Sequence, residues 1–173
     1  MAGSELESVV LDTSVLINFL AINRIDLLAR HPQYRFSVTD HVRREVTIHY
    51  PEQMERLNAA LASDSLMETR VEAIEELTLF AQLISTRRLG AGECAAIAAA
   101  IHRNQILALD DKAARKAALL LNPKMLLLDT QTLMVSLIRA GHLTIQQADG
   151  IKDLWAREHS FQLKIATFKD ILI

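Results

Sequence analysis

The sequence predicts an α/β fold, a three-layer α/β/α sandwich around a central parallel sheet of four to five short strands. Two observations predict this class. Short apolar runs alternate along the chain with longer segments whose apolar residues recur at helical spacing. The short runs are apolar throughout, which is typical of parallel strands buried on both faces. With only 5 glycines and 3 prolines in 173 residues, helix should predominate over long loops.

The expected elements can be placed in order along the chain. Strands are expected at residues 8–11, 35–38, 105–109 and 124–128. Helices are expected to begin after residues 12–14 and then to cover residues 25–29, 40–48, 51–62, 68–88 as one helix or two, 93–103, 112–121, 131–140 and 144–157. Thr39 or Asp40 can cap the third of these helices, and Gly141 can close the helix that ends at residue 140. The pattern leaves open whether residues 165–171 form a last turn.

Composition excludes several classes of protein. Half of the residues are apolar and 23% are charged, which excludes wholesale disorder. Nineteen basic against 21 acidic residues give a net charge of −2, which argues against a polybasic binder of nucleic acid or membranes. The single Cys94 excludes a disulfide framework and multi-cysteine zinc sites, and it fits a reducing compartment. Because no apolar run approaches the ~18 residues of a membrane span and the first residues are acidic, we expect a soluble cytoplasmic protein.

Three of the predicted strands end in aspartate: Asp12, the pair Asp110 and Asp111, and Asp129. Parallel sheets bind ligands beyond the carboxyl ends of their strands. Any one of these residues, taken alone, can equally be the N-cap of the helix that follows it.

Two glutamates on predicted helices strengthen the case for a site. Glu45 lies three residues after Val42 and one before Val46, on or beside an apolar stripe. Glu93 shares its helix face with a run of alanine and isoleucine residues. A carboxylate on a packing face is costly unless something compensates it. Glu93 could instead be a first-turn acid favoured by the helix dipole, and Glu45 a solvated residue paired with a nearby arginine. Taken together, the acids favour a converging carboxylate cluster.

A cluster of carboxylates predicts which metal it would hold. Ligand sets made only of oxygen suit hard ions such as Mg²⁺ or Mn²⁺. The six histidines show neither H-x-x-x-H nor H-E-x-x-H spacing. Divalent ions held by carboxylates serve phosphoryl chemistry, because they lower the pKa of an attacking water and stabilise a leaving oxygen.

Four segments together resemble the PIN domain family, and within it the VapC-like toxin ribonucleases and their relatives. These segments are VVLDTSVLINFL, SVTDHVRREV, LGAGECAAIAAAI and ILALDDKAARKAA, in the family's order and spacing over roughly residues 8 to 140. MLLLDTQTLMVSLIRAGHL looks like the closing strand and helix of one PIN subgroup. The resemblance implies a single PIN-like domain over residues 1–173, with an additional helical segment at about residues 144–173.

The resemblance also implies a site and an activity. PIN proteins cleave RNA with an acidic quartet and divalent metal, through a metal-activated water that attacks the phosphodiester in line. The quartet matches Asp12, Glu45, Glu93 and Asp111, as metal-binding and catalytic residues that take Mg²⁺ or Mn²⁺. Asp110 is the alternative fourth ligand, because many family toxins have T-x-D where this chain has L-D-D. If Asp111 is the ligand, Asp110 is expected mainly to cap the helix that begins at Lys112.

Further expectations follow from the resemblance. Ser14 matches the small polar residue that supports the first aspartate. An endoribonuclease of this kind is expected to be the toxin of a toxin–antitoxin pair and to form a homodimer. The alternative is a non-catalytic PIN-like scaffold that binds a protein or nucleic acid, and its mark would be a missing carboxylate. Basic residues beside the acids could hold RNA phosphates, or could simply be solvated: Arg43, Arg44, Lys112, Arg115 and Lys116.

Two rival motifs fit poorly. Residues 90–95 match the dinucleotide pattern G-x-G-x-x-A, but a predicted helix precedes them where a strand is required. Glu93 would also place a negative charge where the pyrophosphate should lie. A phosphatase of the haloacid dehalogenase type needs a second acid at position 14, where this chain has Ser14.

Overall fold

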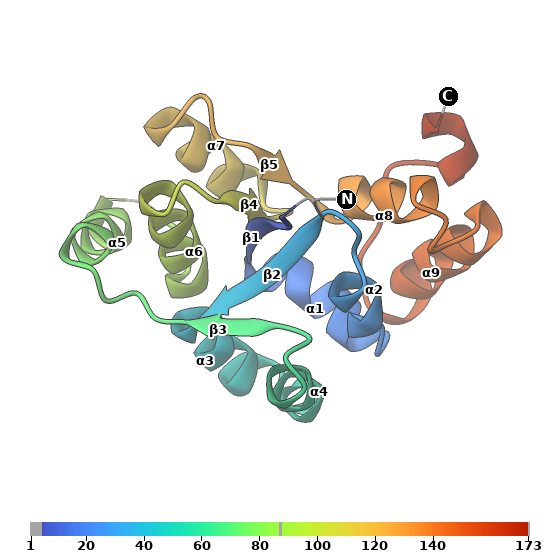
Figure 1. The fold of residues 1–173 in the computed structure, drawn as a ribbon, viewed down its shortest axis with the longest axis horizontal. Helices are drawn as coiled ribbons and strands as arrows, with labels where there is room; N and C mark the ends of the chain where they lie inside the picture. The colour runs from blue at the N-terminus through green and yellow to red at the C-terminus, as the bar shows by residue number, and fades with distance from the viewer. Residues whose placement is uncertain (1–4, 87, 173) are drawn as a thin grey trace.

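The computed structural model describes residues 5–86 and 88–172, and the described chain forms a parallel five-stranded sheet in the order β3-β2-β1-β4-β5 (Figure 1). The strands are β1 (Glu7–Leu11), β2 (Tyr34–Thr39), β3 (Met67–Thr69), β4 (Ile106–Ala108) and β5 (Leu127–Leu128). This is the parallel sheet that the sequence predicts.

Helices cover both faces of the sheet. They are α1 (Thr13–Ala21), α2 (Ile25–Ala29), α3 (Asp40–His49), α4 (Pro51–Ala62), α5 (Ile74–Thr86), α6 (Ala91–His102), α7 (Lys112–Leu121), α8 (Thr130–Arg139) and α9 (Ile145–Glu158), with a 3₁₀ turn η1 (Phe168–Ile171). Successive residues of β1 point to opposite sides, as in any strand. Val9 and Leu11 pack in one core with α1–α4, α8 and α9, while Val10 packs in a second core with α5–α7. The three-layer arrangement is therefore confirmed.

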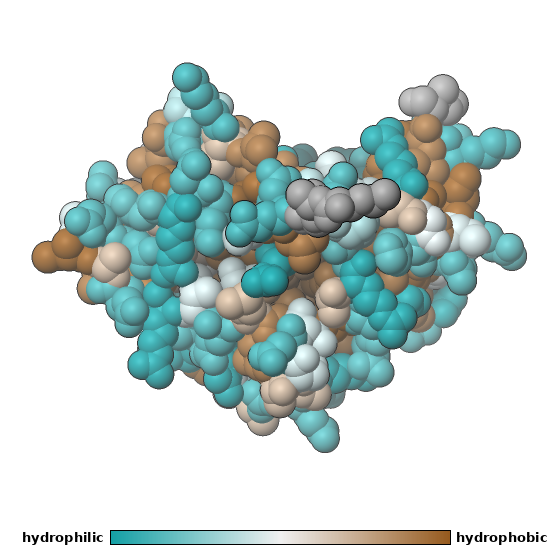
Figure 2. All heavy atoms as spheres, viewed as in Figure 1, coloured by the Kyte–Doolittle hydropathy of each residue, from teal (hydrophilic) through white to brown (hydrophobic). Residues whose placement is uncertain are grey.

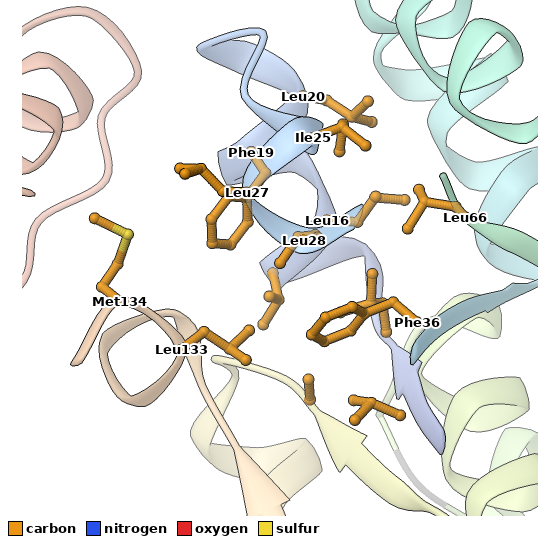
Figure 3. Packing of buried hydrophobic residues seen from close by; sticks show 14 of the residues in the cluster. Leu16, Phe19, Leu20, Ile25, Leu27, Leu28, Phe36, Leu66, Leu133 and Met134 are labelled. Carbon is orange, nitrogen blue, oxygen red and sulfur yellow. The ribbon is translucent and has the colours of Figure 1, made fainter. Parts of the chain in front are cut away.

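The larger core lies between β1, β2 and the helices α1, α2 and α8. Figure 3 shows Leu16 of α1 pointing toward Leu66, with Phe36 of β2 below them in the view and Leu133 of α8 at the lower left of the cluster. Val9, Leu11, Leu16 and Phe19 are all fully buried. A rigid core of this kind fixes the end of β1, where the first candidate site residue follows.

The order of the strands brings two separate chain segments together. β1 pairs with β2 on one side and with β4 on the other, in register Val9–Ile106 through Leu11–Ala108. The chain builds outward from β1 to β3 and then crosses to the other side of β1 to form β4. Such a switch point is where open α/β sheets bind ligands, at the carboxyl ends of the two strands.

The sequence prediction was wrong at one strand and imprecise at others. Residues 67–69 form β3 at the edge of the sheet, and helix α5 begins only at Ile74, so the predicted helix over residues 68–88 starts too early. Residue 87 lies outside the described residues. A three-residue strand is too short to show a periodicity, and it exists here because it pairs with Ser37–Thr39 of β2. β5 is likewise shorter than predicted.

The C-terminal segment packs against the larger core. Trp155 of α9 is fully buried, and its Nε1–H donates to the carbonyl oxygen of Asn18 at 2.8 Å. Its ring meets those of Phe19 and Phe161 edge-to-face, with centroids 5.9 and 5.5 Å away. Phe168 in η1, within the region that the sequence left open, is also fully buried.

The surface in Figure 2 is largely hydrophilic, with hydrophobic areas over α5 at the left and α7 above it. Exposed apolar residues on these two elements include Ile74, Leu77 and Ile84 of α5 and Leu120 of α7. No helix among the described residues is long and apolar enough to cross a membrane.

Candidate active site

Asp12 lies at the carboxyl end of β1 and is 1% exposed. Its backbone N–H donates to Ala108 O at 2.9 Å, which ties it to the end of β4. Its Oδ2 accepts from the backbone N–H of Ser14 at 3.2 Å and from the Ser14 hydroxyl at 2.7 Å, so Asp12 is also the N-cap of α1. Its Oδ1 is buried and has no hydrogen-bond partner among the described residues. Burial raises the pKa of Asp12, against the hydrogen bonds from Ser14.

Ser14 joins the two strand ends at the switch point. Its hydroxyl donates to Asp12 Oδ2 and accepts from the backbone N–H of Asp110 at 3.0 Å. A hydroxyl has one proton to donate, so these two bonds fix its orientation. Ser14 thus holds Asp12 in place, as the family resemblance implies for this position.

Glu45 reaches the same region from α3. Thr39 caps this helix by accepting from Val42 N–H at 3.2 Å, and Val42 and Val46 are fully buried in the core. These contacts turn Glu45 toward the first turn of α6, where its carboxylate lies beside Gly90 and Gly92. Glu45 Oε2 is buried and has no hydrogen-bond partner among the described residues.

Glu93 lies in the first turn of α6, where its Oε2 accepts from Gly90 N–H at 2.7 Å. Glu93 is thus an acid in the first turn of its helix, as the alternative interpretation of the sequence has it, and it also accepts from the backbone of the N-cap residue. Burial, together with the charges of Asp12, Asp111 and Glu45, raises the pKa of Glu93 to about 7, although the Gly90 hydrogen bond acts to lower it. All four predicted carboxylates are thus close enough to interact.

The two aspartates after β4 face different neighbours. Asp111 Oδ1 accepts from Ala114 N–H at 2.8 Å, so Asp111 caps α7. Asp110 Oδ1 accepts from Thr130 N–H at 2.8 Å, and its Oδ2 accepts from the Thr130 hydroxyl at 2.6 Å and from Asn18 Nδ2 at 3.0 Å. The expectation that Asp110 caps α7 was wrong, because the backbone turns Asp110 toward the start of α8. Asp129, the third strand-end acid, caps α8.

The candidate phosphate-binding residues differ in their surroundings. Arg43 pairs with Glu68 and donates to Asn58 Oδ1. Arg115 Nη1 donates to the carbonyl oxygens of Leu109 and Leu128 at 3.0 and 2.9 Å, where it ties α7 to the ends of β4 and β5. The other candidates are exposed: Arg44, Lys112 and Lys116.

The donor set of this site suits a hard divalent ion. It consists of carboxylates, and two of its buried oxygens lack a hydrogen-bond partner in the described chain. Within residues 5–86 and 88–172, no group of three or more Asp, Glu, His or Cys side chains is arranged so that it could hold a metal ion by itself. Mg²⁺ keeps several waters and needs only one or two carboxylates, so these residues fit such an ion.

Comparison with known proteins gives the family. Residues 8–154, most of the chain, match the PIN domain family designated DUF3368. The chain belongs to the PIN domain family. No curated protein sequence matches it significantly.

Two solved structures share this fold at low sequence identity, and a third is similar to part of this chain. A PilT N-terminus domain protein, SSO1118 from Sulfolobus solfataricus P2, is 14% identical with a TM-score of 0.51, over 75% of this chain and 92% of that one. PAE2754 from Pyrobaculum aerophilum is 15% identical with a TM-score of 0.50, over 83% of this chain and 95% of that one. VapBC2 from Rickettsia felis, solved with a DNA fragment from its promoter, is 15% identical with a TM-score of 0.47, over 70% of this chain and 98% of that one.

The structure places three residues at or beside this candidate site that sequence reasoning missed. Thr13 Oγ1 is buried beside the Glu45 carboxylate and has no partner among the described residues. Asn18 Nδ2 donates to both Asp110 and Thr130, each at 3.0 Å. Gly92 lies directly against Glu45. Asn18 and Gly92 left a signal, since a polar residue on an apolar helix face and a glycine inside a helix both require a reason.

Proposed function

We propose that this PIN protein is a metal-dependent endoribonuclease that hydrolyses RNA phosphodiester bonds with Asp12, Glu45, Glu93 and Asp111. One observation carries the proposal. Asp12 Oδ1 and Glu45 Oε2 are buried without a hydrogen-bond partner among the described residues, beside a glutamate whose pKa is raised to about 7. Leaving buried polar atoms unpaired costs free energy, and a bound cation would recover that cost.

The chemistry divides between the ion and the chain. When bound, Mg²⁺ or Mn²⁺ would lower the pKa of the attacking water and neutralise charge on the leaving 3′ oxygen. Asp12 and Glu45 would hold the ion through their unpartnered oxygens, with Asp12 oriented by Ser14. Glu93 uses Oε2 to cap α6, which leaves Oε1 to contact the ion or one of its waters.

The fourth acid of the proposed site is Asp111. The Asp111 charge raises the pKa of Glu93, whereas both oxygens of Asp110 already accept hydrogen bonds from the start of α8 or from Asn18. An Asp111 carboxylate that caps a helix with one oxygen still offers the other. Asp110 is then a supporting residue of the site.

The rest of the proposal concerns partners. RNA phosphates would lie against the exposed Arg44, Lys112 and Lys116, with Arg43 and Arg115 tied to neighbouring groups of the chain. We further propose that residues 1–173 act as one domain, that the protein is the toxin of a toxin–antitoxin pair in the cytoplasm, and that it forms a homodimer. Family membership supports these assignments.

A cleavage assay on mixed RNAs tests the activity. Purified protein should cleave RNA with Mg²⁺ or Mn²⁺, and cleavage should stop in EDTA. Asp12→Asn protein, prepared in the same way, controls for a contaminating nuclease and should be inactive. Undiminished cleavage in chelator by the wild type, with none by the variant, would refute the metal mechanism.

A non-catalytic scaffold is the second candidate. It is favoured by one observation: Glu93 and Asp111 each use an oxygen to cap a helix, which is a structural role. A scaffold would bind RNA or a protein partner without cleaving RNA at any Mg²⁺ or Mn²⁺ concentration. Its binding would also survive Asp12→Asn.

A further inference from the structure

Gly92 occupies an unusual position for a glycine. It is buried in the first turn of α6, two residues after the N-cap Gly90. Alanine is more favourable than glycine inside a helix, because glycine loses more backbone freedom on folding. The neighbouring residues of this helix include many alanines, so nothing about the helix itself requires glycine at position 92.

The space that a side chain would fill at position 92 is already occupied. A Cβ atom there would lie 2.1 Å from Glu45 Oε2 and 3.3 Å from Glu45 Cδ, with Thr13 Oγ1 at 3.1 Å. Atoms that are not bonded do not approach to 2.1 Å. Two other glycines have more room. A Cβ atom added at Gly90 would lie 3.6 Å from its nearest neighbour, and one added at Gly150 in α9 would have no neighbour within 4 Å.

We propose that Gly92 is a positioning residue, whose missing side chain makes the seat for the Glu45 carboxylate in the acidic site. The seat has two sides, the bare first turn of α6 and the hydroxyl of Thr13. Glu45 Oε2 and Thr13 Oγ1 are both buried there without a partner in the described part of the chain. This inference rests on the proposed function, because it gives Glu45 its place in that site.

The type of collision predicts which property would change. The atoms in the way belong to the end of a flexible glutamate side chain and not to backbone. An added methyl group would therefore swing Glu45 out of its seat and leave α6 in place. Gly92→Ala should damage function without lowering stability, which is the pattern of a residue kept for function at a cost in stability.

The first test compares Gly92→Ala with Gly150→Ala, the matched control in a helix where space is open. In EDTA, the control should melt about 2–4 °C above wild type, and Gly92→Ala should not melt below wild type. Mn²⁺ should raise the melting temperature of the control by as much as it raises that of wild type. The rise for Gly92→Ala should be much smaller. Cleavage of RNA should fall at least about 30-fold in Gly92→Ala alone, since a misplacement near 1 Å can cost 100-fold.

The second test shortens the side chain that occupies the seat. Aspartate at position 45 lacks one methylene group, so it leaves room for a methyl group at position 92. In a Glu45→Asp background, adding Gly92→Ala should change cleavage and the Mn²⁺ response by no more than about threefold. An equal loss in both backgrounds would show that Gly92 acts through something other than Glu45, and would overturn the inference.

Crystal structures of wild type and Gly92→Ala decide the question without reference to activity. The inference expects Glu45 Oε2 to leave its place beside position 92 while α6 stays where it is. Glu45 unmoved with α6 displaced, or a melting temperature several degrees below wild type in EDTA, would overturn it. Failure of wild type to cleave RNA would refute the proposed function but not the seat, which the two structures test independently.

Discussion

A glutamate lies at each end of α6, and the two have opposite electrostatic surroundings. At the C-terminal end, Arg103 pairs with Glu76 of α5, which is 3% exposed; Arg103 Nε and Nη2 donate to its two oxygens at 2.6 and 2.9 Å. These bonds lower the pKa of Glu76. At the N-terminal end, burial and three neighbouring carboxylates raise the pKa of Glu93 to about 7. One glutamate is neutralised by a fixed partner and the other is surrounded by like charge.

The difference separates a structural charge from a functional one. Arg103 also donates to Thr69 Oγ1 and to the Arg70 carbonyl oxygen, so it attaches the link between β3 and α5 to α6. The charges of Arg103 and Glu76 are therefore paired within the chain. At the acidic end, two carboxylate oxygens are buried and unpaired within the described residues, and the proposed cation would supply their partner. Substitutions at the two ends should therefore have opposite consequences.

Asp12→Asn should have the largest effect on activity and almost none on folding. Asparagine keeps the α1 cap and can still accept from Ser14, but it removes a buried charge from among carboxylates. RNA cleavage should fall at least about 1,000-fold, while the metal-free protein should be as stable as wild type or more stable by about 1 kcal/mol. Melts in EDTA and in Mn²⁺ check this, and a large loss of metal-free stability with an unchanged Mn²⁺ response would contradict it.

Arg103→Met should have the largest effect on stability. It leaves the Glu76 carboxylate buried without its partner, which should cost about 3 kcal/mol and lower the melting temperature by about 6–12 °C. The matched control is the double variant Glu76→Gln/Arg103→Met, which should recover part of the loss because no unpaired charge remains. Mn²⁺ should still raise the melting temperature of Arg103→Met, as it does in wild type. Its loss would mean that the two ends of α6 are coupled.

Asp110→Asn and Asp111→Asn should separate structure from function next to the site. Asp110 accepts three hydrogen bonds, so an amide NH₂ in place of one oxygen would face a donor and cost about 1–3 kcal/mol. Asp111→Asn should fold normally, because asparagine caps a helix equally well, and should lose most RNA cleavage. Melting temperatures and cleavage rates of the two variants check this. The reverse pattern of activity would make Asp110 the fourth ligand.

Glu93→Gln should change the metal-free stability by an amount that depends on pH. The folded pKa of about 7 lies above the ordinary 4.5, so the folded protein binds this proton more tightly than the unfolded chain. Metal-free stability should therefore fall as pH rises from about 4.5 to 7, with the whole penalty present above 7. Glutamine does not titrate and can still accept from Gly90 N–H. Its advantage over wild type in EDTA should grow by about 1–2 kcal/mol between pH 5 and pH 8; a constant difference would contradict the raised pKa.

The sequence by itself determined the parts of this protein that depend on short stretches of chain. Continuous apolar runs predicted the buried strands, and the residues that end them predicted a site at the sheet edge, with Asp12 at the end of β1. The helices at 25–29, 51–62 and 112–121 were predicted with the bounds that the structure has. Helical periodicity and end residues act over a few positions, so they can be recognised from the sequence alone.

Only the tertiary structure decided the contacts between segments far apart in the chain. β3 exists because β2 offers it an edge, and Asp110 turns to α8 because Thr130 and Asn18 lie there. The seat of Glu45 at Gly92 depends on how α3 packs against α6. Such contacts depend on how whole helices and strands pack against one another. The sequence around either of the two contacting residues does not reveal that packing. For that reason the sequence could predict which residues carry charge at this site, but not which of their oxygens would be left without a partner.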